Sequence, residues 1–234
     1  MGERLQRIMR ELAQSGEIGT KQVCLAAAQV TFMSGAQLVV VSADRSQWLL
    51  CASDLVSRAL ADLEHNVGEG PCVDASRLGR PVLEPDLANP TAAGGWPAYA
   101  PAGAEAGARA VFGFPVRVGA ANLGALGLYS AGPGALSDEQ HADALVMADV
   151  AARVVLELQA GAPPGTVAST MLVKPNFGSV VHQASGMVSV QLGVDVADAL
   201  VALRAHSYRS GHGLDEVAHA VVARTLRFDR LPDV

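Results

Sequence analysis

The spacing of apolar residues changes along this chain of 234 residues. Apolar positions three and four apart predict an opening amphipathic helix over 5–12 and a second helix over 22–32. Short β-rich runs follow, separated by turn residues and by further helical stretches. The predicted strands are 36–42, 47–53, an edge strand within 81–87, 110–116 and 123–130. The pattern favours one antiparallel sheet of about five strands, flanked by helices.

The second half of the chain loses the strand pattern. A capping box at 137–140 opens a long helix, and the run Gly161-Ala162-Pro163-Pro164-Gly165 ends it, because two prolines cannot continue a helical hydrogen-bond ladder. Three helical patterns follow at about 177–192, 196–210 and 214–226. The prediction is an α+β domain over 1–160, a Pro/Gly linker over 161–175 and a small all-α three-helix domain over 176–234.

Charge divides the chain in the same way. The net charge of −6 excludes a protein whose whole surface coats nucleic acid. Residues 1–165 hold 11 Lys/Arg against 17 Asp/Glu, whereas residues 166–234 hold 6 of each. The acidity therefore belongs to the first half, and the neutral tail still permits a basic face.

Composition also predicts a compartment. Three cysteines do not resemble a disulfide framework, and we expect small hydrophobic side chains in the core of a protein from the reducing cytoplasm. The N-terminus is charged and amphipathic, which argues against a signal peptide. No uncharged run reaches the roughly 18 to 20 apolar residues of a membrane span. We expect a cytoplasmic protein without a membrane partner.

The first half resembles the GAF family. The resemblance is carried by Gly68-Glu69-Gly70-Pro71-Cys72-Val73-Asp74-Ala75 and the following Gly79-Arg80-Pro81-Val82, in the form seen in bacterial GAF proteins that precede ANTAR domains. It covers about residues 15–160 and implies a sheet flanked by helices that often holds a small ligand. The expected ligand pocket contains Trp48, Cys72, Phe112 and Phe114, although such residues are also typical of a packed core.

The tail resembles the ANTAR family over residues 177–228. The matching runs are His182-Gln183-Ala184-Ser185-Gly186-Met187-Val188, Gln191-Leu192-Gly193-Val194, the segment 199–206 and Leu214-Asp215-Glu216-Val217-Ala218. Family members commonly have a basic residue where this chain has Ser185. The resemblance implies transcription antitermination by a dimer that binds paired hairpin loops in a nascent leader RNA. Loop bases are readable, whereas the A-form major groove is not.

The candidate RNA contacts are polar or basic residues of this tail, and a solvated helix surface is the alternative for each. They are His182, Gln183, Ser185, Arg204, Arg209, Arg224 and Arg227. Small residues such as Gly186 are expected to permit close helix packing. His206, His212 and His219 lack Cys or carboxylate partners at zinc-site spacing, so we expect no metal and no cofactor.

The sequence therefore predicts a binding protein and not an enzyme, because it has no Walker-A loop, nucleophile elbow or H-E-x-x-H motif. A homodimer is expected through the opening helix and the helix from Ser137. Three alternatives remain open. They are a constitutive dimeric GAF scaffold without ligand, DNA binding by the helical tail, and a free methionine sulfoxide reductase using Cys24, Cys51 and Cys72.

Overall fold

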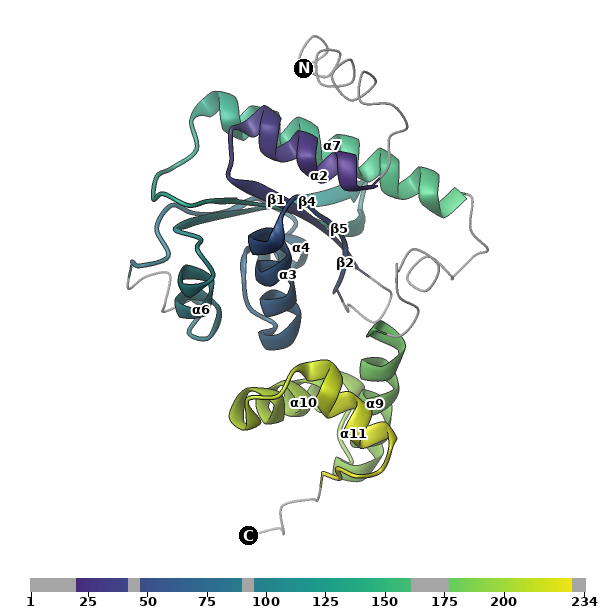
Figure 1. Ribbon diagram of the computed structural model, residues 1–234. Coiled ribbons are helices and arrows are strands. Elements are labelled where there is room, and N and C mark those ends of the chain that lie inside the picture. Colours follow the sequence, from purple (N-terminus) through teal and green to yellow (C-terminus); the bar gives the residue numbers. More distant parts are fainter. Residues whose placement is uncertain (1–19, 42–46, 90–94, 161–176, 229–234) are drawn as a thin grey trace. The chain divides into compact units, whose positions relative to one another are not determined.

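One antiparallel sheet of five strands lies at the centre of the first half of the chain (Figure 1). The computed structural model describes residues 20–41, 47–89, 95–160 and 177–228. The strands are β1 (Gly35–Val41), β2 (Gln47–Ala52), β3 (Val82–Glu84), β4 (Ala110–Val118) and β5 (Ala121–Ser130). Their order is β2-β1-β5-β4-β3, so β1 lies between its hairpin partner β2 and the last strand β5. The predicted five-stranded antiparallel sheet is confirmed.

Helices cover both faces of this sheet. Figure 1 shows α2 (Thr20–Thr31) and α7 (Asp138–Ala160) side by side on one face, with α3 (Leu55–Val67), α4 (Pro71–Leu78) and α6 (Tyr99–Glu105) on the other. On α7, Met147 is fully buried and Arg153 is exposed. The periodic burial of one stripe per helix is what holds these layers on the sheet.

The helix α4 was not predicted, because its flanking glycines indicated only a tight turn. Gly68 adopts φ 73° and ends α3, and Gly70 adopts φ 130° as the N-cap of α4. Pro71 then occupies the first turn of α4, where its missing N–H costs nothing. The Gly-Glu-Gly-Pro-Cys run is therefore a helix-to-helix turn that places Cys72 at the start of a helix.

Two of the three cysteines form a disulfide, which corrects the expectation of unpaired core cysteines. Cys24 on α2 is bonded to Cys51 on β2, with Cα atoms 6.2 Å apart. Both are buried, because Cys24 lies on the sheet-facing side of α2 with Val23 and Ala27. The pairing joins residues 27 positions apart in sequence and depends on how α2 packs on the edge strand. Composition could not reveal that contact.

Residues 168–234 form a second compact unit, and its division from residues 1–167 falls inside the predicted linker. That linker (161–175) and the predicted opening helix (5–12) lie outside the described residues. The second unit contains α9 (Phe177–Leu192), α10 (Val196–Ser210) and α11 (Leu214–Val222). α9 and α10 are bent by 102° across the intervening break. Asp195 caps α10 as predicted, because its carboxylate accepts the Asp198 backbone N–H at 2.8 Å.

The three helices share their own hydrophobic core. Its fully buried members include Ala184, Ala199, Leu203, Leu214 and Val221. The third helix ends at Val222 and not at Leu226 as predicted, and Arg224 beyond it adopts a left-handed φ of 61°. Among the described residues, no single helix is long and apolar enough to span a membrane.

Candidate functional site

The four predicted ligand-pocket residues lie on two different faces of the sheet. The Phe114 ring contacts His141 of α7, with centroids 5.5 Å apart, and Phe112 points to the same face because it is two residues away on β4. Pairing with Val40 places Trp48 on this face as well, on the edge strand β2, where its ring contacts His65 of α3 with centroids 5.3 Å apart. Cys72 lies on α4, on the opposite face. The structure therefore does not bring all four predicted pocket residues together, because the sheet separates Cys72 from the other three.

A buried polar cluster lies instead between the sheet and the α3–α4 turn. Glu64 of α3 is 1% exposed, and its Oε1 accepts the backbone N–H of Cys72 at 2.7 Å. Its Oε2 accepts the side-chain amide of Gln37 on β1 at 3.0 Å. The same Gln37 nitrogen lies 3.7 Å from the Cys72 sulfur. Glu64 thus joins a strand, the helix that carries it and the next helix.

Burial sets the protonation states of this cluster. Desolvation raises the pKa of Glu64 to about 8, although hydrogen bonds from Cys72 and Gln37 oppose that rise. Burial and the adjacent Glu64 raise the pKa of the Cys72 thiol well above its ordinary value. A buried thiol with a raised pKa is a poor nucleophile. Cys72 is therefore not prepared for ligand attachment or oxidation.

Two glycines let α4 lie directly against the sheet. A Cβ atom at Gly113 of β4 would lie 2.2 Å from the Pro71 carbonyl oxygen. A Cβ atom at Gly127 of β5 would lie 2.7 Å from the Cys72 sulfur. Only glycine permits this close approach of helix to strand. At these positions the space between α4 and the sheet is filled by backbone and by the cluster itself.

The segment around α6 closes the same region from the side. The Glu69 carboxylate accepts the backbone N–H groups of Ala98 and Tyr99 at 2.9 and 3.1 Å. The Trp96 indole donates to Asp74 of α4 at 2.9 Å. Tyr99 is fully buried, burial raises its pKa, and its hydroxyl has no hydrogen-bond partner among the described residues. The acidic residues of the Gly-rich run thus attach α6 to α4.

Sequence reasoning missed Gln37, Glu64 and Tyr99. A signal for Glu64 was present, because it continues the buried stripe of α3 formed by Ser57, Leu60 and Ala61. A carboxylate at an apolar helix position indicates a partnered buried acid. The sequence around Gln37 and Tyr99 has no comparable pattern that would have indicated a buried polar contact.

The predicted RNA-contact residues divide by exposure. His182 and Gln183 on α9, Arg209 on α10, and Arg224 and Arg227 beyond α11 are exposed. Ser185 is 2% exposed and donates its hydroxyl to the Val181 carbonyl at 2.8 Å, so it is not available as the predicted surface contact. Arg204 is partly buried, and desolvation lowers its pKa.

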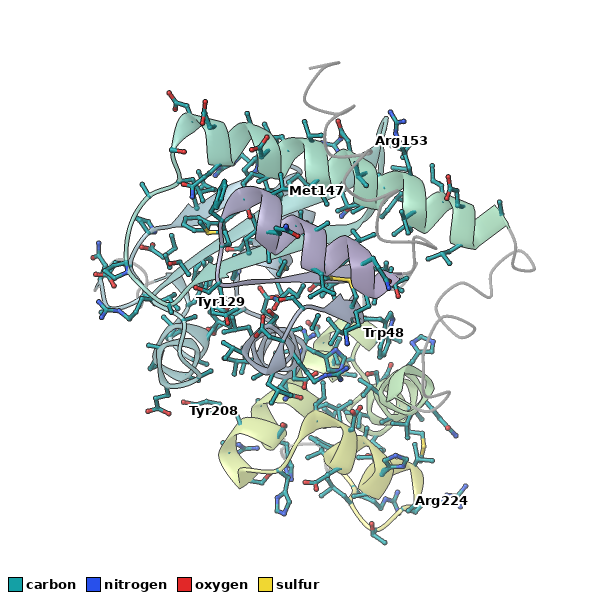
Figure 2. The ribbon with its side chains drawn as sticks, turned by 45° about the horizontal axis from the view of Figure 1, so that its top comes forward. Trp48, Tyr129, Met147, Arg153, Tyr208 and Arg224 are labelled. Atoms are coloured by element: carbon teal, nitrogen blue, oxygen red, sulfur yellow. A yellow bond between two sulfur atoms is a disulfide. The ribbon has the colours of Figure 1, made fainter. Side chains whose placement is uncertain are left out.

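Exposed side chains of this unit lie on more than one side of its three helices. Figure 2 shows Tyr208 of α10 and Arg224 at opposite sides of the three helices. Beyond α11, the Phe228 ring contacts His206 of α10, with centroids 5.4 Å apart, and its N–H donates to Gln191 of α9 at 2.9 Å. These contacts hold the segment that carries Arg227 against α9 and α10. In the part of the chain that the structure describes, no group of three or more His, Cys, Asp or Glu could hold a metal ion.

Comparisons with known proteins identify the first unit. The family model described as "GAF domain" matches residues 20–155. Similar solved structures include GAF domains of phosphoenolpyruvate-protein phosphotransferases. The one from Coxiella burnetii is 17% identical, with coverage of 68% of this chain and 94% of that chain and a TM-score of 0.52. The one from Acinetobacter is 12% identical, with coverage of 69% and 96% and a TM-score of 0.52.

A type II free methionine-R-sulfoxide reductase from Thermoplasma acidophilum is also similar. It is 20% identical, with coverage of 65% of this chain and 96% of that chain and a TM-score of 0.44. At these identities the solved structures show the fold alone. No curated protein sequence matches the chain.

Proposed function

This chain belongs to the GAF domain family over residues 20–155, and we propose that it is a two-part regulator acting by binding and not by catalysis. In this proposal the GAF domain receives a signal. The three-helix unit, as an ANTAR domain, binds hairpin loops in a nascent leader RNA. The bound transcript is held in a form that excludes the terminator hairpin, so transcription continues.

The observation that carries the proposal is a separate three-helix core in which each ANTAR-like run has its own structural place. The run 182–188 lies on α9, and the run 191–194 ends α9 and enters the turn to α10. The run 199–206 lies on α10, and the run 214–218 opens α11. This unit buries its own apolar residues. A small helical domain with its own core can present side chains to RNA without sharing the GAF fold.

Charge on the surface of this unit is compatible with RNA, although its net charge is zero. Residues 199–214 contain two arginines, two histidines and a tyrosine, and no carboxylate. Arg209, Arg224 and Arg227 are exposed, as phosphate contacts require. His182 and Gln183 are exposed on α9 and can donate to bases in an open loop.

The first test is binding of the full chain to an RNA with two closely spaced hairpin loops, measured by fluorescence anisotropy across salt concentrations. Replacing Arg224 or Arg227 by alanine is expected to weaken binding by roughly five- to tenfold and to reduce the salt slope by about one phosphate contact. Arg153→Ala, an exposed arginine on α7 shown in Figure 2, is the matched control.

Three outcomes would overturn the proposal. One is equal affinity for the same RNA with its loops closed into a duplex, and another is an equal loss in Arg153→Ala. The third is preferential binding to duplex DNA, which would support the helical tail as a DNA-binding domain. If loop binding holds, single-round transcription through a downstream terminator is expected to show increased readthrough when the protein is added.

Homodimerisation is part of the proposal, because two paired loops call for two binding units. On the face covered by α2 and α7, the apolar side chains of Leu25, Leu145 and Leu156 are exposed. Apolar residues on neighbouring exposed helices are suited to packing across a two-fold axis. Leu145 and Leu156 lie on α7, the helix predicted from Ser137, and support its part in the expected dimer. Leu25 lies on α2, which was not predicted to take part, and the predicted opening helix lies outside the described residues.

A constitutive scaffold is the second candidate, and the close packing of α4 on the sheet favours it. Gly113 and Gly127 bring α4 against β4 and β5, and the polar groups of Glu64 and Gln37 bond to each other. RNA affinity measured before and after complete unfolding and refolding separates the two candidates. Unchanged affinity supports a scaffold, whereas affinity lost and then restored by the small-molecule fraction released on unfolding supports a sensor.

The proposal places the protein in the cytoplasm with its transcript. Cytoplasmic thiols keep most cysteines reduced. Cys24 is 0% exposed and Cys51 is 7% exposed. Burial of both residues restricts access by reducing thiols and is the feature that would preserve the Cys24–Cys51 bond there.

A further inference from the structure

The outward face of α10 is apolar. Ala197, Val201, Ala205 and Tyr208 follow one another at spacings of four, four and three residues, so they share one side of the helix. Val201 is 61% exposed and Tyr208 is 70% exposed, and Ala197 and Ala205 are also exposed. A solvated helix face is normally polar. The α10 face, defined as these four residues, is therefore suited to contact with another surface.

We propose that the α10 face packs against the α10 face of a second copy of this chain, with the two helices antiparallel. Ala197 and Ala205 on either side of Val201 leave room for another helix to approach closely. Tyr208 supplies the one large side chain, and in the antiparallel arrangement it lies over Ala197 of the second copy. The result is a two-fold contact in which the same surface serves both copies.

Charge complementarity selects the second copy and its direction. Asp198 and Arg209 are both exposed and lie on the same flank of the α10 face, near opposite ends of the helix. The Arg209 guanidinium lies back along α10, 3.4 Å from the Ala205 carbonyl oxygen. Antiparallel pairing brings Asp198 of each copy to Arg209 of the other. Parallel two-fold pairing puts this flank of the two copies on opposite sides of the contact, so it forms neither ion pair and lacks this complementarity.

The registers implied by charge and by packing agree. Matching Asp198 with Arg209 puts the two-fold axis between residues 203 and 204, and matching Val201 with Ala205 puts it at residue 203. Both arrangements describe the same helix pair. Arg204 lies on the opposite flank and is partly buried in its own unit.

This contact rests on the proposed function and adds to it an arrangement of the two RNA-binding units. It would place two three-helix units side by side, with the exposed residues His182, Gln183, Arg224 and Arg227 outside the contact, where two RNA loops would bind. One helix on another buries less than the roughly 1,200 Å² of a standard interface. The contact is therefore weak alone and acts between copies that are already held together or concentrated.

Chemical cross-linking of the full chain without RNA tests the pairing directly. Val201→Cys/Ala205→Cys is treated with a short bismaleimide, using a mixture of unlabelled and ¹⁵N-labelled protein. The expected product is a covalent dimer whose mass spectrum shows position 201 of one copy linked to position 205 of the other. Val190→Cys, which is 84% exposed on α9 outside the α10 face, is the control and should give little dimer. Equal dimer yields from the two variants would overturn the proposal.

Charge reversal tests the direction of pairing. Asp198→Arg or Arg209→Asp, each added to the cross-linking variant, is expected to lower the dimer yield roughly fivefold, because two exposed ion pairs are replaced by repulsion. The combination of both reversals should restore the yield. Restoration is a result that simple misfolding cannot give. Failure of the combination to restore it refutes antiparallel pairing.

Other occupants of the α10 face give different results. If another segment of the same chain covers it, maleimide labelling at position 201 will be slow even in dilute monomer. If RNA covers it, Tyr208→Ala will lower RNA affinity and leave the cross-linking yield unchanged. Either result overturns the proposal. Because the cross-linking contains no RNA, its failure leaves the RNA-binding test intact, and the reverse also holds.

Discussion

Replacing Glu64 by glutamine is expected to remove a large part of the pH dependence of GAF-domain stability. The folded domain holds the Glu64 proton with a pKa of about 8, against an ordinary value of 4.5. A raised pKa means that the stabilisation is complete below the ordinary value and is lost as pH rises through the folded value. At about 1.36 kcal/mol per pKa unit, the full difference amounts to about 5 kcal/mol. Glutamine cannot ionise and should show no such loss.

Urea unfolding followed by tryptophan fluorescence, from pH 5 to pH 9, measures this effect. Both tryptophans of the chain, Trp48 and Trp96, lie in the GAF domain, so the signal reports that domain alone. The difference in unfolding free energy between wild type and Glu64→Gln should shift in favour of the variant as pH rises. Glu105→Gln, an exposed glutamate on α6, should follow the wild type. Parallel curves for wild type and Glu64→Gln would refute a buried protonated Glu64.

Three further changes test other features of the structure. Replacing both Cys24 and Cys51 by alanine should lower the unfolding free energy of the GAF domain by about 3.5 kcal/mol, because the disulfide closes a loop spanning 27 positions. Thiol titration of the unfolded wild type should find one free thiol, and finding three would contradict the disulfide. Gly127→Ala should cost roughly 1 to 3 kcal/mol, since its Cβ would lie 2.7 Å from the Cys72 sulfur; unchanged tryptophan-monitored unfolding would argue against close packing of α4. Gly186→Ala should instead stabilise the second unit by roughly 0.5 to 1 kcal/mol, because its Cβ would meet nothing within 4 Å. Thermal unfolding followed by circular dichroism measures this change in stability. A destabilised variant would support the sequence-based expectation that Gly186 permits close helix packing.

Local patterns predicted the elements well where neighbours in sequence are also neighbours in space. The β1–β2 and β4–β5 pairs follow from short strands separated by turns. The three helices of the second unit follow from helical spacing and from Asp195 as an N-cap. The helix α4 was missed because eight residues between glycines hold too few periods to distinguish a helix from a turn.

The candidate site was predicted less well, because alternation along a strand does not say which face meets which helix. Phe112 and Phe114 were correctly placed on a buried strand, but that face meets α7 and not α4. Cys72 was correctly singled out, but its chemistry depends on Glu64, eight residues earlier. That carboxylate reaches Cys72 only because Gly68 and Gly70 turn the chain sharply between α3 and α4.

By itself, the sequence determined the GAF-like sheet with its flanking helices and the helical character of the tail. These features follow from hydrophobic period, turn residues and caps, which act over a few residues. Only the tertiary structure decided that β1 lies beside β5, that Cys24 meets Cys51 and that Glu64 is buried against Cys72. It also showed that Ser185 is buried while Tyr208 is exposed. The physical reason is that pairing, burial and pKa depend on residues distant in sequence, which only the packing of the layers brings together.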